Sequence, residues 1–99
     1  MDDRVVFRSS DVTDERLVDE ELRRRGFDTY VWTDAPGTYY PEHTHPYREV
    51  RWVLEGEVEI GTATESYHLK PGDSIELAPG VEHWARTTKG VRYMCGSKR

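Results

Sequence analysis

The residues with the clearest chemical potential are three histidines and one glutamate. His43 and His45 are separated by a single residue, and Glu49 follows past a bend expected at Pro46. Residues two apart in an extended chain project to the same face, so both imidazoles can point inward. His83 opens a later predicted strand, which an antiparallel barrel can bring alongside. Three imidazoles and a carboxylate suit one divalent Fe, Mn, Ni or Zn ion, and octahedral geometry would leave two positions for water, oxygen or a chelating substrate.

Several side chains near these four are candidates for substrate binding. In a regular strand Arg51 shares the face of Glu49, where its guanidinium would suit a substrate carboxylate or phosphate. A bulge that turns Arg51 outward, or a structural pair with an acid, is the alternative. Three aromatic residues can line the same mouth or belong to the core: Tyr39, Tyr47 and Trp84. His68 is predicted at the rim or surface, Cys95 is predicted to be a small buried side chain, and no residue is assigned a catalytic role.

The first predicted element is a helix near residues 14–25, with Thr13 as its N-cap. Acidic residues follow in the first turn, and Gly26 stands where a left-handed C-terminal residue is wanted. The arginine run 23–25 favours the negative end of the helix dipole, so it indicates a helix end rather than a binding patch. The residues that form one apolar face toward the barrel are Leu17, Val18 and Leu22.

After Gly26 the pattern changes to short strands separated by glycine and proline. Short strands at nearly even spacing predict an all-β sandwich or barrel. The predicted strands are Thr29–Thr33, Thr38–Tyr40, Glu49–Glu55, Glu57–Ile60, Ser66–Leu69, Ser74–Leu77, His83–Thr87 and Val91–Cys95.

The glycine frame around the histidines resembles the two motifs of the cupin family. A His-x-His pair alone is more often a surface feature than a pair of ligands, so this frame carries much of the metal assignment. The first motif is matched by Gly37, His43, His45, Glu49 and Gly56. The second is matched by Gly72, Asp73, Pro79, Gly80 and His83. Ala78 stands where proline is usual and Thr87 where asparagine often closes the motif, but neither is a ligand position.

The resemblance covers about residues 29–95 and implies a small single-domain cupin. Its fold would be a double-stranded β-helix, or jelly roll, with one short N-terminal α-helix. Residues 1–28 would form a strand and helix extension packed on the barrel, and residues 29–99 the barrel itself. The metal would lie in the barrel mouth, held by four ligands. These are His43, His45, Glu49 and His83.

The same resemblance implies a range of functions. Metal-dependent cupins include dioxygenases, isomerases and decarboxylases that act on small oxygen-containing metabolites, and the 3-His-1-Glu set looks like that of quercetinase-like and acireductone-like dioxygenases. The first hypothesis is therefore a metal-dependent enzyme, dioxygenase-like. The alternatives are a non-catalytic module that binds a small molecule or metal, and a structural protein stabilised by its metal. A fold and a metal shell do not choose among them.

Composition limits the partners. The net charge is −5 over 99 residues, which argues against nucleic acid, whose phosphates require clustered Lys and Arg. No apolar run is long enough to span a bilayer or to form a signal peptide. The single cysteine excludes an intrachain disulfide and fits a reducing compartment. We therefore expect a cytoplasmic protein with a small-molecule ligand, and a homodimer by analogy with other small cupins.

Overall fold

The computed structural model describes residues 4–99, so residues 1–3 of the predicted extension lie outside the described part. One helix and nine strands follow each other along the chain. Their bounds are β1 Val5–Arg8, α1 Glu15–Arg24, β2 Asp28–Asp34, β3 Tyr39–His43, β4 Arg48–Gly56, β5 Val58–Gly61, β6 Ser66–Leu69, β7 Ser74–Leu77, β8 His83–Arg86 and β9 Val91–Lys98. Within the described chain, no helix has the length and apolar character needed to cross a membrane.

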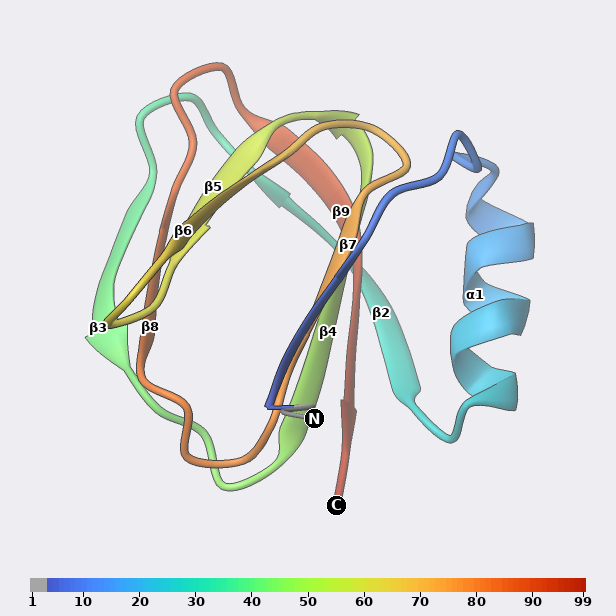
Figure 1. Cartoon of the computed structure of the whole chain (residues 1–99). Coiled ribbons are helices and arrows are strands. Elements are labelled where there is room, and N and C mark those ends of the chain that lie inside the picture. Colours follow the sequence, from blue (N-terminus) through green and yellow to red (C-terminus); the bar gives the residue numbers. More distant parts are fainter. Residues whose placement is uncertain (1–3) are drawn as a thin grey trace.

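The strands form two antiparallel sheets that enclose the barrel interior (Figure 1). The five-stranded sheet has the order β1-β7-β4-β9-β2, and the four-stranded sheet has the order β3-β8-β5-β6. The predicted all-β jelly roll with one short helix is therefore confirmed. Strand β2 is an edge of the five-stranded sheet and β3 an edge of the four-stranded sheet, and residues of both strands line one cavity.

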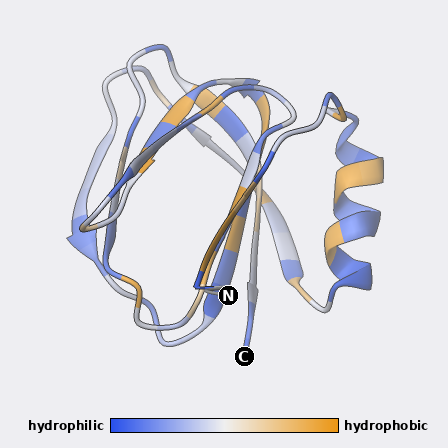
Figure 2. Ribbon diagram, in the orientation of Figure 1, coloured by the Kyte–Doolittle hydropathy of each residue, from blue (hydrophilic) through white to orange (hydrophobic). Residues whose placement is uncertain are grey.

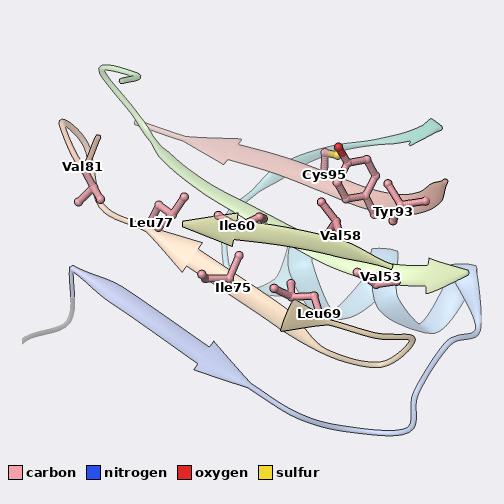
Figure 3. Packing of buried hydrophobic residues seen from close by; sticks show 10 residues of the cluster. Val53, Val58, Ile60, Leu69, Ile75, Leu77, Val81, Tyr93 and Cys95 are labelled. Atoms are coloured by element: carbon pink, nitrogen blue, oxygen red, sulfur yellow. The ribbon is translucent and has the colours of Figure 1, made fainter. Parts of the chain in front are cut away.

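Strand β4 is buried on both faces, and its alternation separates the site from the outer core. Val50, Trp52 and Leu54 belong to one hydrophobic cluster, whereas Val53 belongs to the other. Figure 3 shows this second cluster inside the barrel, where strands from both sheets contribute apolar side chains. Alternation along the strand then places Glu49, Arg51 and Val53 on the inner face.

Helix α1 lies beside the five-stranded sheet (Figure 2), and two of its residues, Val18 and Leu22, belong to the same hydrophobic cluster as apolar residues of β4. Val18 and Leu22 are fully buried, as predicted, but Leu17 is 47% exposed, so its inclusion in the packed face was wrong. The N-cap is Asp14 rather than the predicted Thr13. The Asp14 carboxylate accepts a hydrogen bond from the Leu17 amide at 3.0 Å, which satisfies an otherwise unpaired N–H of the first turn.

No bounds were predicted for the strand of the N-terminal extension, and one turn shows why a glycine is required. The pattern VVFR of β1 pairs with β7 at the sheet edge, with Val5 opposite Leu77. Gly56 ends β4 with a φ of +77°, and a Cβ there would lie 2.1 Å from the carbonyl oxygen of Gly90. The motif glycine at the end of β4 therefore allows two backbones to approach each other closely.

Candidate metal centre

Strand pairing brings the two distant histidines together. His43 ends β3 and lies directly opposite His83 at the start of β8 in the antiparallel ladder. The ladder shifts register between Tyr40 and His43, which is the signature of a β-bulge. His45 lies just beyond β3, and its carbonyl oxygen accepts a hydrogen bond from the Gly80 amide at 2.9 Å. Two motifs far apart in the sequence therefore meet at one end of the barrel.

The three imidazoles form a compact cluster. Each ring offers one nitrogen to a group in which all the candidate ligand atoms lie within 4.8 Å of one another. Ring centroids are 4.3 Å apart for His43 and His83, 4.9 Å for His43 and His45, and 5.4 Å for His45 and His83. The cluster includes one buried ring, that of His83, which is 5% exposed.

Hydrogen bonds to the outer ring nitrogens orient these histidines. Nδ1 of His43 lies 2.7 Å from the carbonyl oxygen of Pro41, and Nδ1 of His83 lies 2.9 Å from that of Val81. Because a carbonyl oxygen only accepts, both Nδ1 atoms carry a hydrogen, and in the neutral rings Nε2 carries the lone pair. Such a bond on the outer nitrogen is the usual arrangement around metal-ligating histidine.

His45 completes the set by a different contact. Its Nδ1 lies 3.3 Å from the Tyr47 hydroxyl, and the two rings stack with centroids 4.9 Å apart. Its Nε2 is buried without a hydrogen-bond partner. Burial lowers the pKa of His45 more than the nearby Glu49 raises it, so the ring favours its neutral form.

Glu49 is buried beside two of the histidines. Its Oε1 lies 2.7 Å from Nε2 of His83, and its Oε2 lies 3.7 Å from Nε2 of His45. Burial alone would raise the pKa of Glu49, but its contact with His83 and the charge of Arg51 together lower it. The pKa of His83 is raised, because its contacts with Glu49 and Val81 outweigh burial.

These donors fit a divalent metal. Oε1 of Glu49 has no hydrogen-bond donor although Nε2 of His83 is close, which is the geometry of two acceptors when His83 is neutral. Two facing acceptors repel unless a proton or a cation lies between them. Imidazole nitrogens and a carboxylate are ligands that Fe, Mn, Ni and Zn accept. The histidine cluster therefore suggests a metal site, and the Glu49 carboxylate lies beside two of its rings.

Arg51 lines the cavity, and it also forms the pair with an acid that was the alternative prediction. One of its nitrogens, Nη2, lies 3.1 Å from Oε2 of Glu49, and Nη1 lies 3.4 Å from the hydroxyl of Tyr30. The guanidinium also stands over the ring of Tyr93, 5.5 Å from its centroid. A cation is therefore held between the candidate metal ligands and the aromatic part of the cavity.

The cavity has a volume of about 690 Å³, and beyond the candidate ligands four aromatic side chains line it. Its lining residues are Tyr30, Trp32, Tyr40, Pro41, Glu42, His43, His45, Glu49, Arg51, Ile60, His83, Ala85 and Tyr93. The three aromatic residues expected at the mouth are not among them. Tyr39 is 54% exposed, Tyr47 stacks on the ring of His45, and Trp84 packs over Gly61.

Neither the aromatic side of the cavity nor the carboxylate behind it was predicted from the sequence. Asp34 is 7% exposed and accepts hydrogen bonds from Trp32 Nε1 at 2.9 Å, the Tyr40 hydroxyl at 2.6 Å and the Tyr93 hydroxyl at 2.5 Å. Burial first, and then the bond to Asp34, raises the pKa of both phenols, so they remain donors. Period-two spacing of Tyr30, Trp32 and Asp34 was the available sequence signal.

Two side chains lie outside the site. His68 is exposed on β6 and contacts Glu57 at 3.0 Å. Cys95 is fully buried in the inner cluster, where burial raises the pKa of its thiol. Neither side chain belongs to the histidine cluster.

Comparisons with known proteins agree with this fold. A family model described as Cupin domain matches residues 30–95. The chain is 37% identical to dimethylsulfoniopropionate lyase DddQ of Ruegeria pomeroyi over 59 residues, which cover 59% of the chain and 29% of the lyase. A crystal structure of that lyase matches with a TM-score of 0.68 and 29% identity over 74% of the chain and 38% of the lyase. The chain thus spans about a third of the lyase's length.

A second structure matches nearly the whole chain. A DUF861 family protein of Thermotoga maritima is 21% identical, with a TM-score of 0.66 over 95% of the chain and 99% of that protein. At this identity the match shows a shared fold. Because the family model spans about two thirds of its residues, the chain belongs to the cupin domain family.

Proposed function

We propose that this chain is a metal-dependent cupin enzyme that acts on a small carboxylate-bearing metabolite. One divalent transition metal would be held by four residues, His43, His45, Glu49 and His83. The observation that carries this proposal is the convergence of three imidazoles whose outer nitrogens are engaged elsewhere. A bound metal would supply Lewis-acid polarisation of a substrate oxygen.

The substrate class rests on Arg51 and on the size of the cavity. Its guanidinium is directed into a space of about 690 Å³ and already pairs with a carboxylate, that of Glu49. A second carboxylate arriving from the ligand would meet the same fork of donors, which recognises planar anions by paired hydrogen bonds. The apolar walls would exclude water around it. Arg51 would thus bind and orient the substrate next to the metal ligands.

The reaction to be assayed first is a lyase reaction, in which a small substrate that bears a carboxylate is cleaved by elimination. Support comes from the likeness to dimethylsulfoniopropionate lyase, which extends over 59% of this chain. Dioxygenase, isomerase and decarboxylase reactions, which the sequence resemblance implied, stay predictions beside it. Oxygen uptake separates the dioxygenase from the lyase, because elimination consumes no oxygen.

The test uses protein purified without an affinity-tag metal. We expect about one Fe, Mn, Ni or Zn per chain by elemental analysis and turnover of a small carboxylate by the loaded protein. In Arg51→Gln the KM should rise about 10- to 100-fold, because a charge-assisted hydrogen bond contributes roughly 1.5–3 kcal/mol. Arg51→Lys keeps the positive charge but loses the paired donors, so its KM should lie between that of wild type and that of Arg51→Gln. Less than a tenth of an equivalent of metal would refute the proposal.

A non-catalytic binding module is the second candidate, and one observation favours it. Two of the three phenols that line the cavity, Tyr40 and Tyr93, donate their hydroxyl protons to Asp34, so these two hydroxyls are already engaged with a carboxylate. Stoichiometric metal and ligand binding without turnover would support this candidate. The homodimer and the cytoplasmic location remain predictions, to be tested by light scattering and by cell fractionation.

A further inference from the structure

The cavity has an aromatic side formed by the two sheet edges that border its opening. We use the term aromatic wall for Tyr30 and Trp32 of β2 and Tyr40 of β3, all of which line the cavity. Tyr30 and Trp32 pack edge to face with ring centroids 6.4 Å apart, and about half of each side chain is exposed. These large rings remain accessible although each of them can bury extensive apolar area. This aromatic surface beside the candidate metal centre is therefore available to contact a ligand in the cavity.

Asp34 supplies a buried negative charge behind this wall. All three of its hydrogen-bond donors are neutral groups, and the described residues include no cation in an ion pair with it. Buried carboxylates are normally paired with a cation, because isolated charge is costly in a low-dielectric interior. Asp34 does not itself line the cavity. Arg51 stands over the ring of Tyr93, one of the donors to Asp34. A further positive charge in the cavity would likewise reach Asp34 through the rings that donate to it.

Two rings of the aromatic wall are hydrogen-bonded directly to Asp34. Trp32 and Tyr40 each donate to the same oxygen, Oδ1 of Asp34. A donor bonded to a carboxylate is polarised, which increases electron density on the ring. The face of an aromatic ring is already the negative part of its quadrupole and attracts cations. The wall presents these rings to the cavity, whereas Tyr93 already lies beneath Arg51.

We propose that the aromatic wall is a subsite for a fixed-charge onium group, a sulfonium or a quaternary ammonium, of the ligand. An onium group is favoured over a protonated amine because the wall offers ring faces and no free carboxylate to accept N–H bonds. The cavity lining contains two acidic residues, Glu49 of the candidate metal centre and Glu42, which is exposed. The proposal concerns Tyr30, Trp32 and Tyr40 as ligand contacts and Asp34 as a positioning residue.

Strand register places Arg51 and the aromatic wall a short distance apart, which limits the length of a ligand that contacts both. Arg51 of β4, Cys95 of β9 and Tyr30 of β2 are paired across three adjacent strands, and Tyr93 pairs with Trp32 two residues further along. Two residues along a strand span about 7 Å. Arg51 also contacts the Tyr30 hydroxyl at 3.4 Å. A short zwitterion would therefore reach the guanidinium with its carboxylate and the wall with its cation. This part rests on the proposed function, which assigns the carboxylate to Arg51.

The test compares two probes of equal shape by isothermal titration calorimetry. The first, 3-(trimethylammonio)propanoate, carries the cation, and the second, 4,4-dimethylpentanoate, has carbon in place of the charged nitrogen. We expect the cationic probe to bind metal-loaded wild-type protein about tenfold more tightly. Trp32→Leu and Asp34→Asn should bring this ratio toward one, whereas a merely structural role would weaken both probes equally. Trp84→Phe and Glu42→Gln should preserve the ratio.

The outcomes separate this inference from the proposed function. Equal affinity for the two probes, or binding of neither to metal-loaded protein, would overturn the onium subsite and leave the metal proposal intact. An affinity ratio between the probes that persists in Trp32→Leu would also overturn the onium subsite. Because Trp32 is half exposed, this variant avoids the folding risk of Asp34→Asn. A ratio lost in Glu42→Gln would assign the cation to the cavity rim and overturn the role of the wall. Discrimination in protein that binds no metal would support the subsite while refuting the metal.

Discussion

Thermal stabilisation by metal tests the histidine cluster most directly. His83 is 5% exposed and joins β8 to the cluster, so a ligand that binds this cluster binds only the folded chain. At a free metal concentration one hundred times Kd, the expected stabilisation is about 2.7 kcal/mol. An unfolding entropy of about 2.1 cal/mol/K per residue, taken over 99 residues, converts this to a rise in Tm of about 13 °C.

The perturbation is His83→Ala, measured by differential scanning calorimetry with and without Mn or Zn. Loss of one of three imidazoles should reduce the metal-induced rise in Tm to about a third or less of the wild-type value at the same metal concentration. His68→Ala is the matched control, because His68 is exposed and outside the cluster, and its rise should equal that of wild type. A full metal-induced rise in His83→Ala would refute the assignment of His83 as a ligand.

Two further predictions concern stability away from the cavity. Glu76 contacts Arg8, Arg25 and Arg48, and although burial opposes it these contacts lower its pKa. Its stabilisation should therefore be complete above about pH 4.5 and decline as the pH falls through the lowered value. Urea titrations should show Glu76→Gln less stable than wild type by about 1–3 kcal/mol near neutrality, with the difference shrinking at acid pH; a pH-independent difference would contradict this. Leu22→Ala should cost about 2–5 kcal/mol because Leu22 is fully buried under the sheet, whereas Leu17→Ala, at a half-exposed position, should cost less than about 1 kcal/mol; equal losses would show that α1 does not pack as described.

Local patterns were sufficient for much of the fold. Glycine and proline punctuation separated eight of the strands, and the apolar positions Val18 and Leu22 predicted the buried face of the helix. The cap was misassigned because Thr13 and Asp14 are both good acceptors, and only the path of the backbone decides which of them reaches the Leu17 amide. Strand β1 could not be given bounds in the N-terminal extension, because four residues at a sheet edge carry little periodic signal.

The candidate ligands and the position of Arg51 follow from the sequence, because strand alternation and motif spacing are local properties. Which aromatic residues border the cavity depends on how two separate sheets meet, and no local pattern contains that information. Tyr39, Tyr47 and Trp84 lie beside the motifs in sequence but outside the cavity lining. The aromatic wall and Asp34 come instead from strand β2 and its neighbours. Barrel closure, driven by burial of apolar area from distant strands, decided that arrangement.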